Sequence, residues 1–181
     1  MTNLSQKSLS PRTLAILTGI FAAAAFRLVP HPPNFAPIGA MALFGGAMLS
    51  KRWLAFAAPF GALLLSDAIL GFHATMWAVY LAFGLIVALG MVLLKTRSTV
   101  RIAGASLAAS LLFFIISNFA VWLSGGYPMT LAGLAACYTA AIPFFWNSVA
   151  GDLFFSALLF GGFALMERGF PALRDREPLT A

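Results

Sequence analysis

The chain has very few charged residues and a single cysteine. Only 9% of its 181 residues are Asp, Glu, Lys or Arg, whereas 61% are hydrophobic. A soluble domain typically carries about 25% charged residues, so the composition excludes an ordinary soluble domain and predicts one integral membrane domain. One cysteine, Cys137, excludes an intramolecular disulfide and a cysteine-rich metal site.

Motifs of nucleophilic and metal-dependent catalysis are also missing. The sequence contains no Gly-x-Ser-x-Gly elbow, no His-Glu-x-x-His and no phosphate-binding loop. We therefore expect no enzyme and no cofactor. His31, His73 and Asp67 could ligate a metal, but they lack the i, i+4 spacing that would place ligands together. Scattered histidines at the membrane interface are the favoured interpretation, and no metal is expected.

Six apolar blocks follow one another along the chain. A bilayer core of about 30 Å needs roughly 20 apolar residues per helix, and we expect spans at about 14–29, 37–49, 53–72, 76–94, 102–123 and 146–166. The second block is short and rich in Gly39, Gly45 and Gly46, so it is expected to begin as an irregular or re-entrant piece. The uncharged, aromatic connection 127–145 predicts a short lid or re-entrant helix between spans five and six.

The basic residues fall almost entirely on one side of these blocks. Ten of the eleven lie in the tails or in the loops that follow the second and fourth blocks, namely Lys7, Arg12, Lys51, Arg52, Lys95, Arg97, Arg101, Arg168, Arg174 and Arg176. Short loops rich in Lys and Arg stay cytoplasmic, so both termini are predicted to be cytoplasmic. Because these residues form no single patch, nucleic acid is not an expected partner.

This pattern predicts an all-α, six-transmembrane-helix bundle in a bacterial cytoplasmic (inner) membrane. We expect a cytoplasmic N-terminal tail at 1–12, the transmembrane domain at 13–167 and a cytoplasmic C-terminal tail at 168–181. The first block also resembles a signal peptide. Removing it would upset the alternation of charge, so it is expected to be retained.

Two aspartates within the apolar blocks are the sharpest signals. An ionisable group in a span costs free energy and tends to find a partner inside the bundle. Asp67 and Asp152 could recognise a ligand, a cation or a proton, or one of them could pair with Arg27. Arg27 could instead hold a carboxylate or phosphate, or extend to the interface. A weaker alternative is a membrane enzyme that uses the two carboxylates as an acid–base pair.

Aromatic and amide side chains gather on the predicted outer side. Stacking surfaces beside amides suit a flat heteroaromatic ligand, although an interfacial aromatic belt is the alternative. The candidate substrate-binding residues are Arg27, Asn34, Asp67, Asn118, Trp122, Tyr127, Tyr138, Trp146, Asn147 and Asp152. Ala15, Gly19 and Ala23 form a stripe of small residues that could pack inside the bundle or dock another membrane protein.

The segment Pro30-His31-Pro32-Pro33-Asn34-Phe35-Ala36-Pro37-Ile38-Gly39-Ala40 is the most specific motif. With 65–67, 117–119, 127–128, 137–138, 142–145 and 151–152, it resembles a bacterial family of small membrane proteins of unassigned function that is catalogued under transport. The resemblance covers about residues 12–166.

That family more loosely resembles the substrate-capture (S) components of energy-coupling-factor (ECF) vitamin transporters. This resemblance implies six helices, both termini inside and an outward pocket under the loops. It also implies that the stripe on the first helix docks a coupling subunit driven by ATPases. No vitamin-specific signature is present, so the substrate stays open.

We therefore expect a substrate-binding membrane component for uptake of a small, aromatic or vitamin-like solute from the outer side. The expected partners are the lipid bilayer, a small-molecule ligand, and either a coupling subunit with ATPases or a larger membrane complex. The alternative is a structural accessory subunit of a larger respiratory or photosynthetic membrane complex.

Overall fold

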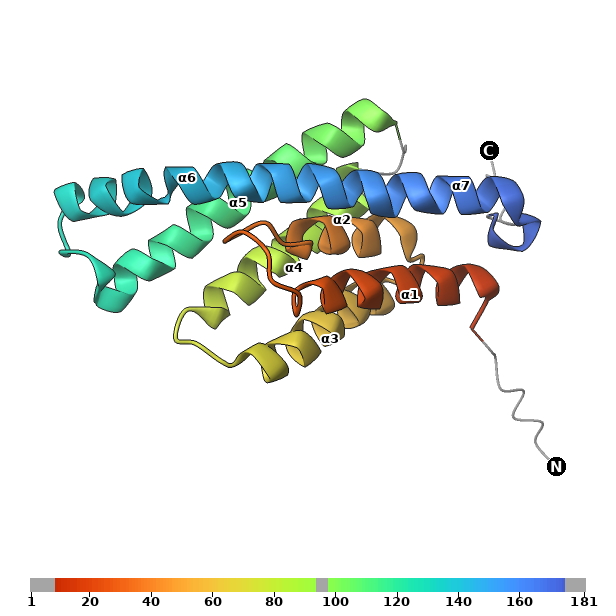
Figure 1. Ribbon diagram of the computed structural model, residues 1–181, viewed down its shortest axis with the longest axis horizontal. Helices are drawn as coiled ribbons and strands as arrows, with labels where there is room; N and C mark the ends of the chain where they lie inside the picture. Colours follow the sequence, from red (N-terminus) through yellow and green to blue (C-terminus); the bar gives the residue numbers. More distant parts are fainter. Residues whose placement is uncertain (1–8, 94–97, 175–181) are drawn as a thin grey trace.

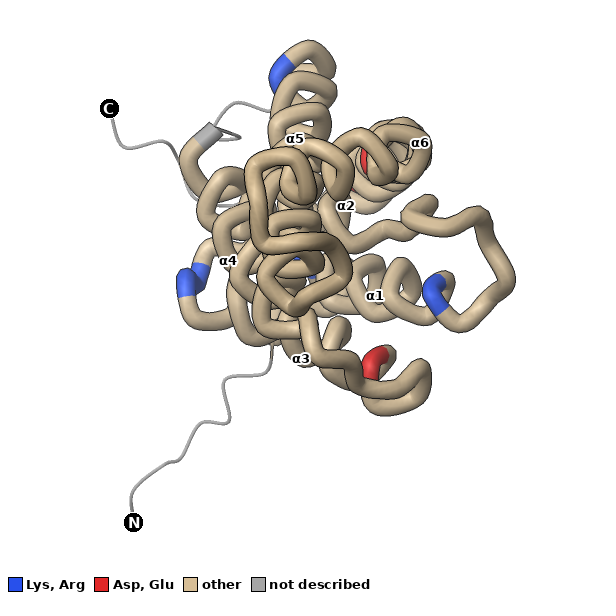
Figure 2. The backbone as a smooth tube through the Cα atoms, turned by 90° about the vertical axis from the view of Figure 1, so that its left-hand side faces the viewer, with Lys and Arg blue, Asp and Glu red and all other residues tan. Residues whose placement is uncertain are grey.

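The computed structural model describes residues 9–93 and 98–174, and within them the chain is helical with no strand (Figure 1). The predicted all-α class is confirmed. Lys7, Lys95, Arg97 and Arg176, which contributed to the charge pattern, lie outside the described residues. In the end-on view of Figure 2, Lys, Arg, Asp and Glu mark only a few positions of the backbone.

The helices are α1 (Pro11–Phe26), α2 (Ile38–Met48), α3 (Arg52–Leu70), α4 (Met76–Leu93), α5 (Thr99–Val121), α6 (Leu131–Ser156) and α7 (Gly162–Gly169). The π-helical turn η1 (Trp122–Gly126) extends α5, the π-helical turn η2 (Ala157–Gly161) joins α6 to α7, and a 3₁₀ turn η3 (Pro171–Leu173) follows. The side chains of Ser10, Ser98 and Thr130 cap α1, α5 and α6 by accepting a backbone N–H of the first turn.

Three of these helical stretches are long and apolar enough to cross a membrane: Arg52–Leu70, Thr99–Gly126 and Leu131–Gly169. Three further apolar helices are shorter, at Pro11–Phe26, Ile38–Met48 and Met76–Val92. The described helices are therefore compatible with a membrane protein. Their lengths do not support six full spans.

The predicted lid helix between blocks five and six is wrong. Thr130 starts a helix that continues past Pro143 and, through η2 and α7, reaches Gly169. Residues 131–145 are thus the first part of α6, and the helix begins well before Trp146. A proline inside a helix removes one hydrogen bond, but continuing the helix keeps the other backbone groups of this apolar stretch paired.

The short helix α2 lies at the centre of the bundle. It packs against α1, α3, α4, α5 and α6, and residues 39–46 are all buried. Its 11 residues rise only about 16 Å, at 1.5 Å per residue. Residues 27–37, which precede it, contain no helix. The second block itself is helical from Ile38 onward, so the irregular backbone lies before the predicted start of the block and the expected irregular beginning at its glycines is wrong.

Glycines allow the neighbours of α2 to approach its backbone closely. A Cβ atom at Gly46 would lie 2.2 Å from the carbonyl oxygen of Val87, and one at Gly90 would lie 2.6 Å from the carbonyl oxygen of Leu43. Helices α2 and α4 therefore cross backbone against backbone, as small residues permit in membrane bundles. On another face, a Cβ at Gly45 would lie 2.5 Å from the ring of Pro59 in α3.

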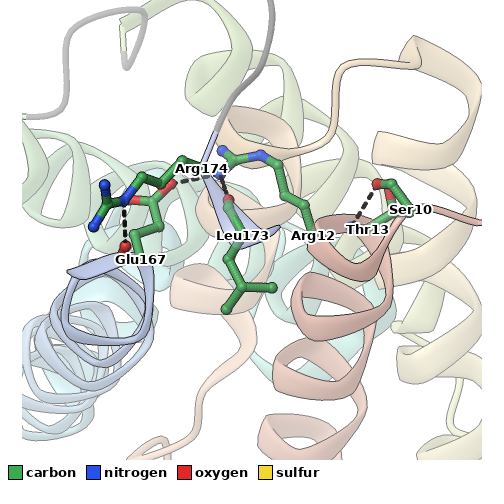
Figure 3. Close-up of polar contacts among 6 residues, drawn as sticks. All are labelled: Ser10, Arg12, Thr13, Glu167, Leu173 and Arg174. Atoms are coloured by element: carbon green, nitrogen blue, oxygen red, sulfur yellow. Dashed lines mark hydrogen bonds and ion pairs between the residues drawn. The ribbon is translucent and has the colours of Figure 1, made fainter. Parts of the chain in front are cut away.

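The start of α1 and the end of α7 meet at the same end of the molecule. Arg12 forms an ion pair with Glu167 and donates to the carbonyl oxygen of Leu173 at 2.7 Å (Figure 3). Arg174 donates to the carbonyl oxygen of Glu167 at 2.9 Å. Both ends of the described bundle thus lie on one side of the molecule.

Candidate functional site

Asp67 is held in an internal ion pair. Its Oδ1 lies 2.7 Å from Nη2 of Arg27, and its Oδ2 accepts a hydrogen bond from the Tyr80 hydroxyl at 2.9 Å. Arg27 also donates to the Ser66 hydroxyl and, at 3.4 Å, to the carbonyl oxygen of Leu63. The alternative of an internal Asp–Arg pair is therefore confirmed for Asp67. The pair ties the end of α1 to α3, and Tyr80 adds α4.

Asp152 caps the N-terminus of α2 from a different helix. The first N–H groups of a helix have no partner within it, and Pro37, which precedes α2, offers no side-chain cap. Asp152, on α6 and 5% exposed, fills this role by accepting from the backbone N–H of Ala40 at 3.2 Å. Its other oxygen accepts from the Ser110 hydroxyl at 2.6 Å. The partial positive charge at a helix N-terminus favours a carboxylate at this position.

Gly39 makes this approach possible. A Cβ atom at position 39 would lie 2.4 Å from Oδ1 of Asp152, so any other residue here would displace the carboxylate from its place beside α2. The glycine-rich start of α2 and the buried aspartate of α6 therefore form one structural unit.

A cavity of about 340 Å³ lies beside this unit. Its walls come from the segment before α2, from α2 itself and from the ends or middles of α1, α3, α5 and α6. It is lined by Arg27, His31, Asn34, Ala36, Ile38, Gly39, Leu70, Phe113, Ser148 and Asp152. Asn34 is exposed whereas Ser148 and Asp152 are buried, so the cavity leads from the surface to the start of α2. We call it the outer cavity.

A second cavity of about 680 Å³ lies nearer the other end of α5 and α6. Its lining is largely apolar, with Ser106, Ser156, Thr99 and Glu167 as polar members, and Met48 at the end of α2 contributes to it. Thr99 begins α5 and Glu167 lies in α7, so this cavity is on the side of the basic loops. We call it the inner cavity.

Three of the candidate substrate-binding residues meet at the outer cavity. Arg27, Asn34 and Asp152 line it, and Asp67 joins them through its ion pair with Arg27. Asn34 has a positive φ of 62°, a backbone conformation that asparagine tolerates better than most residues. This brings its short amide into the wall between Pro33 and the start of α2.

Six other candidates lie elsewhere and line neither of these two cavities: Asn118, Trp122, Tyr127, Tyr138, Trp146 and Asn147. Asn118 and Tyr138 donate to the carbonyl oxygens of Phe114 and Ile115, at 2.8 and 2.6 Å. These bonds keep their polar groups within the α5–α6 hairpin.

The remaining four candidates of this group are at or near the surface. Trp122 donates to the carbonyl oxygen of Pro128 at 2.9 Å, and Asn147 to that of Pro33 at 2.9 Å. Tyr127 is half-buried, and Trp146 is 63% exposed. The Asn147 bond ties the segment before α2 to α6.

The stripe of small residues on α1 faces the interior. Ala23 is buried and Ala15 packs against the core. A Cβ atom at Gly19 would lie 3.6 Å from Leu159 and 3.7 Å from Phe44. Packing inside the bundle therefore accounts for Ala15, Gly19 and Ala23.

Neither histidine belongs to a metal site in the described part of the chain, where no group of three His, Cys, Asp or Glu residues could hold an ion. His31 lies 2.9 Å from the carbonyl oxygen of Pro32 and His73 lies 3.0 Å from the Thr75 hydroxyl.

Sequence reasoning missed the serines around Asp152. Ser148, Asp152 and Ser156 recur every fourth residue on α6, and Ser106 and Ser110 do so on α5. This i, i+4 recurrence places them on one face of each helix. It was the signal that could have identified them, because polar residues repeated at this spacing are unusual in an apolar helix.

Comparison with known proteins gives one match. A model described as "Family of unknown function (DUF6580)" matches residues 7–173. No curated protein and no solved structure matches the chain. The match fits the expected family of unassigned function, and it shows no resemblance to the S components of ECF transporters.

Proposed function

Because the chain belongs to this family of unknown function, DUF6580, we propose its function from the site itself: it is a membrane protein that binds a small solute in the outer cavity, as a step in uptake. The observation that carries this proposal is the convergence of Arg27, Asn34 and Asp152 on one cavity of about 340 Å³. Ligand pockets commonly measure about 300–1,000 Å³ and combine apolar walls with a few placed polar groups.

The proposed setting is a bacterial inner membrane with both termini in the cytoplasm. Helix α2 crosses only half of the bilayer, and residues 27–37 enter the other half from the outside, so the two together complete one crossing. The remaining helices complete the other five. Interrupted helices whose ends lie near the middle of the membrane are typical of solute sites in transporters. Their irregular backbone is tolerated where it lines a cavity.

The lining favours a small solute with several hydrogen-bonding groups. Asn34 offers an amide donor and acceptor, and His31 and Ser148 add further polar atoms. Phe113 supplies an aromatic surface for a ring of the kind expected of a vitamin-like molecule. The sequence holds no nucleotide-binding motif, so the energy for uptake would come from a gradient or from a partner such as a coupling subunit.

The test is ligand binding to the purified protein in lipid nanodiscs. Native mass spectrometry would look for a co-purifying molecule, and thermal shifts would screen a panel of vitamins, nucleobases and amino acids. Asn34→Gly removes the amide and suits the positive φ at this position. It should weaken binding by about 2- to 10-fold, the equivalent of one hydrogen bond of about 0.5–1.5 kcal/mol.

Asn118→Ala is the matched control, because its amide bonds to the backbone of α5 outside the outer cavity. It should leave the affinity unchanged. The opposite result, with Asn118→Ala weakening binding and Asn34→Gly neutral, would move the site to the aromatic residues of the α5–α6 hairpin. Absence of any bound molecule and of any thermal shift would refute the proposal.

A further inference from the structure

Five buried polar residues lie along the interface between α5 and α6. Ser148, Asp152 and Ser156 lie on one face of α6, and Ser106 and Ser110 lie on the facing side of α5. All five are buried, with exposed fractions between 0 and 7%. Polar residues placed so deep in an apolar bundle cost free energy and commonly mark ion or proton routes. We call these five residues the polar seam.

The seam is bonded across the helix interface at two levels. The Ser110 hydroxyl donates to Asp152 at 2.6 Å, and one turn closer to the cytoplasmic end the hydroxyls of Ser106 and Ser156 are 2.8 Å apart. The two levels are separated by one helical turn, about 5.4 Å. Ser106 and Ser148 also donate to backbone carbonyl oxygens of their own helices, those of Ile102 and Phe144.

Each end of the seam opens into a different cavity. Ser148 and Asp152 line the outer cavity, whereas Ser106 and Ser156 line the inner cavity. Buried hydroxyls and one carboxylate therefore bridge the apolar layer that separates the two.

We propose that protons pass along the polar seam between the outer and the inner cavity, and that Asp152 is the group that carries them. This inference rests on the proposed embedding in a membrane, but on no particular solute. If the proposed solute uptake also holds, a proton gradient would supply its energy.

The other ionisable groups facing Asp152 leave this role to it. Arg27 and His31 share the outer cavity, and Arg27 is paired with Asp67. Helix α2 faces Asp152 with backbone N–H groups and α5 with the Ser110 hydroxyl. Among the described residues of the seam, Asp152 is the one carboxylate.

The steps balance without a co-reactant. The Asp152 carboxylate takes a proton from water in the outer cavity and becomes a neutral carboxyl group. The carboxyl group passes a proton to the Ser110 oxygen while that hydroxyl releases its own proton to a water molecule between the two levels, and this water passes a proton on to the Ser106–Ser156 pair. Ser106 and Ser156 relay the proton in the same way to water in the inner cavity, and the carboxylate is restored.

The experiment uses full-length protein in liposomes that contain a pH-sensitive dye and potassium. Valinomycin sets an inside-negative potential, and proton entry acidifies the dye. Wild-type protein should acidify the interior faster than protein-free vesicles do. Asp152→Asn should reduce the rate to that of protein-free vesicles, and the double variant Ser106→Ala, Ser156→Ala should also lower it.

Ser117→Ala is the matched control, because Ser117 lies on α5 and bonds to the backbone carbonyl of Phe113 outside the seam. Its rate should equal that of the wild type. Asp152 also caps α2, so Asp152→Asn could unfold the protein. The double serine variant leaves that cap in place and keeps the test decisive.

Two results would overturn the proposal: a wild-type rate equal to that of protein-free vesicles, or a double serine variant as fast as the wild type. Failure of the proposed solute binding is separate, since it would show in the nanodisc assays and leave the proton rate unchanged.

Discussion

Replacing Gly46 with alanine tests the backbone packing of α2 against α4. The new methyl group would lie 2.2 Å from the carbonyl oxygen of Val87, where ordinary contact begins at 3.4 Å, so the helices would have to separate by about 1.2 Å. The nearest atoms belong to the backbone of Val87 and Met91, which no rotamer change can move. Because α2 is surrounded by the other helices, such a shift would disturb the centre of the bundle.

The expected cost follows from two opposing effects. Overpacking a closely packed core costs about 1–3 kcal/mol, and a rigid backbone neighbour places Gly46→Ala at the upper end of this range. Alanine is about 1 kcal/mol better than glycine within a helix, which offsets part of the cost. We therefore expect a net loss of about 2 kcal/mol in the free energy of unfolding.

Reversible unfolding in mixed detergent micelles, followed by circular dichroism, would measure this loss. The matched control is Gly104→Ala on α5, where a Cβ atom meets nothing within 4 Å. That variant should be neutral or slightly more stable. If Gly46→Ala unfolds at the same detergent fraction as Gly104→Ala, the close crossing of α2 and α4 is wrong.

Three further changes test the polar contacts. Arg27→Gln leaves the buried Asp67 carboxylate without its ion pair and should lower the free energy of unfolding by about 3–5 kcal/mol. Adding Asp67→Asn should recover much of this loss. A double-mutant cycle of unfolding in which the two effects simply added would refute the pairing. Tyr80→Phe removes one hydrogen bond to Asp67 and should cost about 1 kcal/mol, so an unchanged unfolding midpoint would contradict that contact. Gly39→Ala places a methyl group 2.4 Å from the Asp152 carboxylate and should lower both the thermal midpoint and the rate of proton entry into liposomes. A wild-type rate of proton entry in this variant would argue against the close contact between Asp152 and the N-terminus of α2.

The sequence predicts the helical class and the deep polar residues well. Low charge and long apolar blocks leave helices as the expected fold, and the described residues are helical. Arg27 and Asp152 were identifiable because a polar group in an apolar block needs a partner or a function, and Asn34 because it belongs to the specific motif between the first two blocks. The structure shows that these three do share a cavity.

The sequence could not show how the helices face one another. Asn118 and Tyr138 were grouped with the site by their position near one end of the chain's apolar blocks, yet their hydrogen bonds stay within the α5–α6 hairpin. The predicted start of the last helix was wrong for a related reason. Pro143 and the aromatic residues around it suggested a break, but local preference was outweighed by the need to keep backbone groups paired along an apolar stretch.

The long helical stretch from Leu131 to Gly169 has a consequence for the surrounding lipid. Its 39 residues extend for about 58 Å at 1.5 Å per residue, whereas a bilayer with its headgroups measures about 40–45 Å. In the proposed membrane setting this helical stretch must tilt or project beyond the headgroups. A mismatch of this kind is relieved by tilting the helix or by locally thickening the bilayer. The stability of this protein should therefore depend on bilayer thickness. Its thermal midpoint should be higher in vesicles made of lipids with longer acyl chains.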